Sequence, residues 1–278
     1  MIGGIELGGT KCIVAVGNSP MDIVSKETIP TRDPESTFSQ INSFFAKYNV
    51  DSMGVGCFGP IVLDSSSDDY GLILSDSKIG WKGVNIFHEL SSVSDNVRID
   101  TDVNAAALGE YTYGAGQDSR IFVYITVGTG IGVGVLHNGS PYIGNFHLEA
   151  GHIFIPNEEK IEGICRFHGS CWEGLASGPA LIHRWGDNVR DFPPDHEAWV
   201  EEAKLLSYGV INIISNHSPD KIVLGGGVMS QRQLFGMIRL NVNSMWNDFT
   251  PLGPLSSLIS EPMLGKDSGI VGSLCLTL

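Results

Sequence analysis

The sequence predicts an α/β protein made of two similar halves, and three observations lead to this fold class. Segments with the apolar spacing of strands alternate with segments that have the spacing of helices along the 278 residues. A glycine-rich turn between two apolar strands occurs at residues 2–17 and again at residues 121–136. Each turn can arrange several backbone N–H groups around one anion. We therefore expect a duplicated fold whose halves present facing phosphate loops.

The first half should begin with the hairpin of residues 2–17. A helix follows within residues 35–48, because apolar residues such as Phe38 and Ile41 recur there at helical spacing. The remaining elements are a strand that ends in a turn at residues 51–60, a strand at residues 97–100 and a helix at residues 103–110. Asp102 lies at the last strand-to-helix junction, where we expect it to be the helix N-cap.

The second half repeats this order. Residues 121–136 form its hairpin, and an apolar stripe indicates a helix at residues 198–215. A strand at residues 221–224 leads into a turn of three glycines and then into another helix. The tail, residues 264–276, is rich in small residues and should form a helix packed at close range.

Composition and charge narrow the class of protein. Apolar residues make up 42% of the chain and charged residues 17%, as expected for a well-folded chain. The formal net charge of −14 argues against nucleic acid or an anionic membrane as a partner. No apolar run of about eighteen residues and no basic leader is present, so we expect neither a membrane span nor a secretory signal.

The five cysteines, an odd number, favour a reducing, cytoplasmic location. Cys12, Cys57 and Cys275 lie in apolar runs and should be core residues. The other two belong to a set of metal-ligating residues, namely His152, Cys165, His168 and Cys171.

This Cys2His2 set suits tetrahedral Zn²⁺, and four protein ligands leave no open position, so the zinc should be structural. Glu149 and Glu173 flank the set, where a metal-fixed loop could aim them at a polyhydroxylated ligand. The alternative is a pair of buried free cysteines with scattered surface histidines.

Six segments together resemble the ROK family of bacterial sugar kinases, within the actin-like ATPase-domain superfamily. They are residues 5–11 (first phosphate loop), 58–60, 102–106, 126–132 (second phosphate loop), 149–152 with the cysteine loop, and 224–228 (adenosine loop). ROK repressors add an N-terminal DNA-binding region. This chain starts at the first phosphate loop, which favours an enzyme.

Within the family, the pattern Cys-x-x-His-Gly-x-Cys-x-Glu-Gly is most similar to zinc-containing fructokinases, whereas three-cysteine loops are more typical of glucokinases. Two departures stand out. Glu6 occupies a position where the family often has Asp, although Glu is common in its fructokinase branch. Asp76, Ser77 and Lys78 replace a Thr-Pro-Lys element, which leaves the ligand contacts of that segment open.

The resemblance implies duplicated actin-like ATPase (ribonuclease H-like) domains with an active-site cleft between them. Residues 1–114 would be a small N-terminal α/β domain, and residues 115–264 a large C-terminal α/β domain with the zinc loop. The C-terminal helix, about residues 265–278, would pack back on the N-terminal domain.

The implied activity is ATP-dependent phosphorylation of a hexose at its 6-hydroxyl, with D-fructose as the leading substrate. Glucose, mannose or an N-acetylhexosamine remain alternatives, as does a non-catalytic sugar sensor. Asp102 would be the catalytic base, since the family's catalytic Asp falls at this position. Asp100 is a competitor that lies on the strand. Glu6 would orient Mg²⁺, the cofactor of ATP.

Further roles follow from the same resemblance. The ATP and phosphate contacts would be Gly8, Gly9, Thr10, Lys11, Gly128, Thr129, Gly130, Gly225, Gly226 and Gly227. The sugar contacts would be Gly59, Pro60, Asp102, Asn104, Glu149, His152 and Glu173. His147, Phe167 and Trp172 are interpreted as packing residues. The expected partners are ATP and the hexose, and we expect a homodimer because similar proteins commonly form one.

Overall fold

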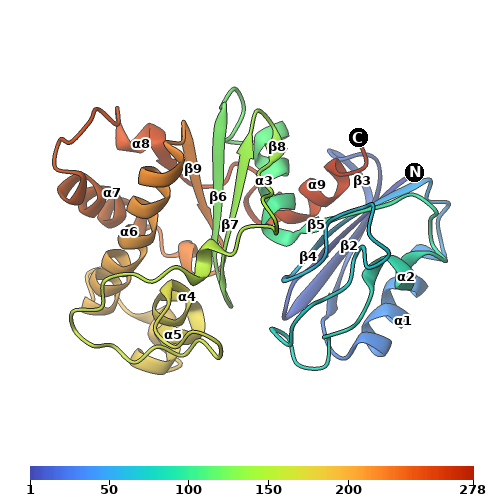
Figure 1. The fold of residues 1–278 in the computed structure, drawn as a ribbon, viewed down its shortest axis with the longest axis horizontal. Coiled ribbons are helices and arrows are strands. Elements are labelled where there is room, and N and C mark those ends of the chain that lie inside the picture. Colours follow the sequence, from blue (N-terminus) through green and yellow to red (C-terminus); the bar gives the residue numbers. More distant parts are fainter.

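The computed structural model describes all 278 residues and contains two five-stranded sheets, one in each half of the chain (Figure 1). Strand order is β3-β2-β1-β4-β5 in the first sheet and β10-β9-β6-β7-β8 in the second. In each sheet the central strand pairs antiparallel with the strand that follows it and parallel with the strand on its other side. The expected α/β fold with two similar halves is confirmed.

The first half contains the predicted elements and, in addition, a strand at Asp22–Pro30 and a short helix at Ile86–Leu90 that were not predicted. Its strands are β1 (Ile2–Leu7), β2 (Lys11–Ser19), β3 (Asp22–Pro30), β4 (Ser52–Cys57) and β5 (Val97–Thr101). Its helices are α1 (Pro34–Phe45), α2 (Ile86–Leu90) and α3 (Asp102–Tyr113). Helix α1 starts where the Asp33 side chain accepts a hydrogen bond from the Ser36 N–H, and it buries Phe38 and Ile41.

The N-cap expected at Asp102 is wrong. Thr101 caps α3, because its hydroxyl oxygen accepts a hydrogen bond from the Asn104 N–H at 3.1 Å. Asp102 is instead the first helical residue, and its own carboxylate accepts from the Val103 N–H at 2.8 Å. The hydroxyl one position earlier reaches the orphan N–H groups of the first turn, so the carboxylate of Asp102 is not needed as the cap.

The second half repeats the arrangement with more helices. Its strands are β6 (Ile121–Val127), β7 (Ile131–His137), β8 (Ser140–Pro141), β9 (Lys221–Gly225) and β10 (Ile259–Ser260). Its helices are α4 (Trp172–Ala176), α5 (Gly178–Trp185), α6 (Glu197–His217), α7 (Gln233–Trp246), α8 (Leu255–Leu258) and α9 (Ser268–Cys275). Helices α6 and α7 pack on each other and, with the second sheet, enclose its apolar core.

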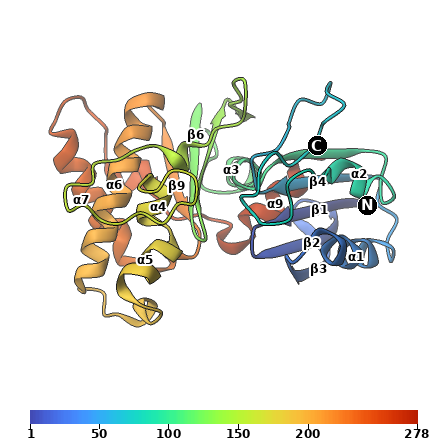
Figure 2. The same ribbon diagram turned by 60° about the horizontal axis from the view of Figure 1, so that its bottom comes forward.

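Two helices cross between the sheets, as Figure 2 shows. Helix α3 contributes Ala107 to an apolar cluster with Phe122 of the second sheet, although α3 follows the last strand of the first sheet. Helix α9 follows the last strand of the second sheet and packs Leu274 on the first, in a cluster with Ile13. Each half therefore contributes one helix that packs against the sheet of the other half. The proposed boundaries at residues 114 and 264 stay predictions.

The crossing helices touch through backbone. A Cβ atom on Gly109 of α3 would lie 2.8 Å from the backbone nitrogen of Gly272 in α9, and a Cβ on Gly272 would overlap the carbonyl of Ala105. Only glycine permits so close an approach. The expected close packing of the small-residue tail is confirmed.

Glu110 of α3 joins the two connections between the halves. Its side chain is completely buried and accepts hydrogen bonds from the Ala115 N–H at 2.8 Å and the Met263 N–H at 3.0 Å. It also accepts from the Leu264 N–H and the Ser268 hydroxyl, both at 2.8 Å. The segment that leaves the first half and the segment that returns to it are thus held by one carboxyl group.

Cys12, Cys57 and Cys275 are buried, as expected for core residues. None of the helices has both the length and the apolar character that a membrane span requires.

Candidate active site

The two predicted phosphate loops face each other. The first, residues 8–10, joins β1 to β2 and is closed by a hydrogen bond from the Gly8 N–H to the Lys11 carbonyl at 3.0 Å. The second, residues 128–130, joins β6 to β7 and is closed by a shorter-range hydrogen bond, from the Gly128 N–H to the Gly130 carbonyl at 2.8 Å. The hydroxyl oxygens of Thr10 and Thr129 are 3.4 Å apart and exposed. A chain of phosphates between the loops could be contacted from both sides.

The predicted adenosine loop, with glycines at residues 225–227, lies next to the second phosphate loop. Gly226 has φ +90°, and a Cβ there would overlap the carbonyl of Val127. A Cβ on Gly227, in contrast, would meet nothing within 4 Å, and the backbone nitrogen of Gly227 is 3.9 Å from the Cβ position of Gly128. The loop therefore lies beside the second phosphate loop with open space at Gly227, as a nucleotide-binding loop requires.

Glu6 and Asp102 form a carboxylate pair at the carboxyl end of the first sheet. Glu6 lies one residue from the end of β1, and its Oε2 is buried without a hydrogen-bond partner. Burial raises the pKa of Glu6 to about 7, an effect that Lys11 opposes and Asp102 strengthens. Gly269 leaves room for this carboxylate, since a Cβ there would lie 2.6 Å from Oε2.

Asp102 is partly exposed, yet its carboxylate has little solvent around it. Burial raises its pKa to about 6, while the hydrogen bond from the Val103 N–H opposes the rise. A Cβ on Gly56, the sheet neighbour of Glu6, would lie 3.2 Å from the Cα of Asp102. The orphaned oxygen of Glu6 near a second carboxylate fits Mg²⁺, which prefers oxygen ligands.

Asn104, a predicted sugar contact, lies in the strand-to-helix junction. It is 4% exposed, and its side-chain N–H donates to Asp100 Oδ1 at 2.7 Å. The Thr101 N–H donates to the same oxygen at 2.7 Å. Burial raises the pKa of Asp100 to about 6 against these two hydrogen bonds. Asp100 lies on strand β5, as expected, and its carboxylate holds Thr101 and Asn104, the residues on either side of Asp102 and Val103.

The four predicted zinc ligands converge. One ligand atom from each of His152, Cys165, His168 and Cys171 lies within 4.8 Å of all the others. The Nδ1 of His152 is 3.5 Å from the sulfur of Cys171 and 3.7 Å from that of Cys165. The ligand-to-ligand edges of a tetrahedral zinc site are about 3.5 Å, given bonds of about 2.0–2.3 Å. The donor set and its spacing fit Zn²⁺.

The acids beside this cluster connect it to other parts of the site. The free nitrogen of His152, Nε2, is 3.9 Å from Glu149 Oε2. Burial raises the pKa of Glu149 to about 7, and the nearby carboxylates of Glu173 and Asp102 add to the rise. Glu173 Oε2 accepts a hydrogen bond from the Ile131 N–H at 3.0 Å, directly after the second phosphate loop.

The predicted sugar wall at Gly59 and Pro60 meets the other half of the chain. The peptide bond between them is cis. A Cβ on Gly59 would lie 3.1 Å from Glu149 Oε1 and 2.9 Å from the ring of His147. His147 is buried, and its Nε2 accepts a hydrogen bond from the Ile61 N–H at 3.1 Å. The predicted packing role of His147 is incomplete, because this residue also joins the halves beside Glu149.

The sequence interpretation missed the contacts of residues 76–78. The Ser77 hydroxyl donates to the Gly59 carbonyl at 2.7 Å, and the Lys78 ammonium donates to the Gly9 carbonyl at 2.8 Å. Arg166 of the cysteine loop donates to the carbonyl of Asp76 at 3.2 Å. The departure of this segment from Thr-Pro-Lys drew attention to it, but no local sequence pattern indicated which residues it contacts.

Trp172 is a buried packing residue, as expected, but the same expectation for Phe167 is wrong. Phe167 is 54% exposed, and its ring lies 5.8 Å from the guanidinium carbon of Arg166. It sits on a loop held by side-chain ligands, so its ring need not be buried to keep the loop in place.

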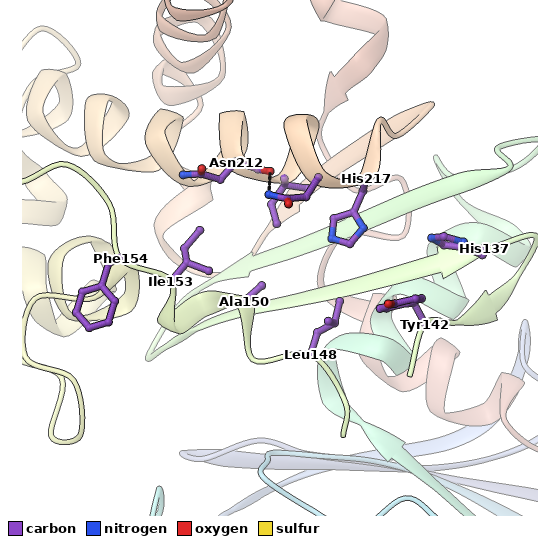
Figure 3. Close-up of a pocket in the computed structure, with 10 residues that line it drawn as sticks. His137, Tyr142, Leu148, Ala150, Ile153, Phe154, Asn212 and His217 are labelled. Carbon is purple, nitrogen blue, oxygen red and sulfur yellow. Dashed lines mark hydrogen bonds between the residues drawn. The ribbon is translucent and has the colours of Figure 1, made fainter. Parts of the chain in front are cut away.

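A groove of about 580 Å³ lies away from these residues. It lies between α6 and the segment that carries Ala150, and His137, Tyr142 and His217 line one end (Figure 3). None of the predicted site residues lines it, although Ala150 adjoins Glu149. The groove does not include the phosphate loops, but it adjoins the predicted zinc ligands through Ile153 and Phe154, which follow His152.

Comparison with known proteins assigns the chain to a family. Residues 2–278 match the model of the ROK family. The chain is 36% identical over 281 residues to a fructokinase of Pediococcus pentosaceus, covering 99% of this chain and 97% of that protein. It is 35% identical over 288 residues to a fructokinase of Zymomonas mobilis, covering 99% and 96%.

A solved structure has the same fold. A ROK family glucokinase from Streptomyces griseus, in complex with glucose and AMPPNP, aligns with a TM-score of 0.80 at 24% identity. The alignment covers 99% of this chain and 98% of that protein. The facing loops and the converging predicted zinc ligands lie on this same fold. Because the family model also matches nearly the whole length of the chain, this chain belongs to the ROK family.

Proposed function

We propose that this protein transfers the γ-phosphoryl group of ATP to a hexose, that D-fructose is the substrate and that the 6-hydroxyl is the acceptor. The observation that carries the proposal is the meeting of the two phosphate loops at Thr10 and Thr129, 3.4 Å apart. The full-length similarity to fructokinases supports the choice of sugar.

Asp102 is the base in this proposal. Its carboxylate takes the proton of the sugar hydroxyl as the hydroxyl oxygen bonds to the γ-phosphorus and the bond to the ADP oxygen breaks. A pKa near 6 keeps the carboxylate ionised at neutral pH and yet basic enough to accept a proton. Asp100 is less suited, because its Oδ1 already accepts two hydrogen bonds.

The phosphates are held by the N–H groups and hydroxyls of residues 8–10 and 128–130, with Lys11 beside the first loop, and the adenosine lies along residues 225–227. Glu6 would hold Mg²⁺ or its waters. Bound there, Mg²⁺ neutralises charge on the phosphates.

The zinc loop forms the sugar side. Glu149 and Glu173 accept hydrogen bonds from sugar hydroxyls, and His152 donates through Nε2 while Nδ1 faces the cysteine sulfurs. Gly59, Pro60 and Asn104 complete this side, with Asn104 acting from its place against Asp100. Zinc supplies rigidity when bound and takes no part in phosphoryl transfer.

A coupled ADP-release assay across a panel of sugars tests the proposal. Fructose should give the highest kcat/KM, with glucose, mannose and N-acetylhexosamines lower. A higher value for one of those sugars would keep the kinase and change its substrate. No ADP above background with any sugar would favour a non-catalytic sensor.

We also infer a cytoplasmic homodimer. Light scattering on a size-exclusion column should then report twice the 29.9 kDa of the chain. A mass of one chain at micromolar concentration would rule the dimer out.

A further inference from the structure

We propose that Lys78 is a positioning residue for phosphoryl transfer, because it sets the direction of the N–H group that the first phosphate loop presents to the nucleotide. The inference rests on the proposed function and concerns a residue whose contacts the sequence left open. Lys78 would act through Gly9 of the loop.

All three carbonyls of the first phosphate loop are held by side chains or backbone outside the loop. The Gly8 carbonyl accepts from the Thr31 hydroxyl at 2.8 Å, and the Thr10 carbonyl accepts from the Thr31 N–H at 3.1 Å. The Gly9 carbonyl accepts from the Lys78 ammonium at 2.8 Å. Lys78 also donates to the Thr31 carbonyl at 3.0 Å, so the two residues form one support.

The direction of each carbonyl decides the direction of the next N–H. In a planar trans peptide the C=O and the N–H point to opposite sides. Lys78 holds the Gly9 carbonyl, so the Thr10 N–H points away from Lys78. The N–H groups of Gly9 and Thr10 have no hydrogen-bond partner in the structure, which leaves them free for a phosphate oxygen.

Without this support, the loop could present the wrong group. Glycine at position 9 tolerates rotation of its peptide plane, and a Cβ there would meet nothing within 4 Å. A rotated Gly9–Thr10 peptide would direct a carbonyl oxygen at the phosphates, where it would repel them. Thr31 holds the carbonyls of Gly8 and Thr10, and the hydrogen bond from Lys78 is the contact that restrains the Gly9 carbonyl itself.

Charge works in the same direction. The site gathers the carboxyl groups of Glu6, Asp102 and Glu149, whose ionised forms repel a nucleoside triphosphate. Lys78 brings a positive charge to within 2.8 Å of the loop that receives the phosphates. The adjacent hydroxyl of Ser77 is bonded to Gly59, so the base of the lysine is fixed to the predicted sugar wall.

The test compares Lys78→Met, Lys78→Arg and the control Lys82→Met, which removes an exposed lysine four positions away. Calorimetry measures the Kd of magnesium AMPPNP and of adenosine for each variant without sugar, and steady-state assays measure KM for ATP and for fructose. Lys78→Met should weaken AMPPNP binding and raise KM for ATP by about tenfold or more. Adenosine affinity should not change, since adenosine has no phosphates.

Lys78→Arg should recover part of the AMPPNP affinity, because it keeps the charge and the donors, and Lys82→Met should match the wild type. Unchanged AMPPNP affinity in Lys78→Met would overturn the inference. An equal loss for adenosine, or a lower melting temperature that Lys78→Arg does not restore, would reduce Lys78 to a structural residue. A wild type that binds AMPPNP but phosphorylates no hexose would refute the proposed function, and the role of Lys78 would then be limited to holding the loop that binds the nucleotide phosphates. A wild type without AMPPNP binding would refute both.

Discussion

The two hairpins share one frame and differ in chemistry. Glu6 and Thr126 occupy the same position, second from the end of the central strand of their sheets. Glu6 lies opposite Gly56 of the parallel neighbour, and Thr126 lies opposite Gly225. The first half thus carries a buried acid where the second carries a hydroxyl. The pattern of strand pairing is the same in both sheets, whereas the residues near the strand ends give each half a different chemistry.

The loops are also braced differently. Lys78 and Thr31, from the first half itself, hold the carbonyls of the first loop. The second loop is held by the Gly178 N–H, which donates to the Gly128 carbonyl at 2.8 Å, and by Glu173. Glu173 follows Cys171, a proposed zinc ligand, by two positions. The second loop is therefore braced from beside the proposed metal site, and the first loop is braced by Lys78 and Thr31.

The largest expected effect of a substitution is at Asp102, the proposed base in the first half. Asp102→Asn should lower kcat by about 10³-fold, because the amide cannot accept the hydroxyl proton. The Kd values for AMPPNP and fructose should stay within a few-fold of the wild type. Single-turnover kinetics and calorimetry measure both, and near-normal turnover would remove Asp102 from the mechanism.

Removal of zinc should affect the second half first. Protein treated with a chelator, with its metal content measured, should unfold at a lower temperature and bind fructose about tenfold more weakly, because Glu149 and Glu173 lose their fixed direction. Adenosine binding should change little. Re-addition of zinc is the control. Apo protein with full fructose affinity would contradict the bracing role.

Gly226→Ala tests the backbone of the adenosine loop. At φ +90° with the Val127 carbonyl in the way, the alanine should cost about 1–3 kcal/mol of unfolding free energy. Gly227→Ala is the matched control for stability, since Gly227 has φ −66° and an unobstructed Cβ position. Denaturant unfolding of both variants measures the difference. Equal stabilities would show that the loop can rearrange.

The last prediction concerns pH dependence. Burial raises the pKa of Asp102 to about 6, so kcat/KM should fall about tenfold for each pH unit below that value. Stability has the opposite sign: the folded state binds the extra proton, so this group's contribution to the free energy of unfolding declines as pH rises from about 4 to 6. Asp102→Asn should remove that decline. A kcat/KM profile that is flat from pH 5 to 8 would contradict the assignment.

Local patterns predicted most of the fold. The glycine turns, the strands beside them and the grouping of His152 with Cys165, His168 and Cys171 could be predicted because short segments carry them. The N-cap of α3 was wrong by one residue, since Thr101 and Asp102 are both good caps and only geometry decides between them. The contacts of His147 with residue 61 and of Lys78 with residue 9 depend on the tertiary fold, and no pattern in one sequence contains them.

Glu110 has a consequence for motion. Both chain connections between the halves end in hydrogen bonds to its carboxyl group, one through Ala115 and the other through Met263 and Leu264. A change in the angle between the halves must either break these bonds, which would leave the buried carboxyl group of Glu110 without its donors, or turn around them. A rotation of the halves around Glu110 costs less free energy than breaking these hydrogen bonds. The two connecting segments should therefore act as a single axis of rotation that passes through this carboxyl group.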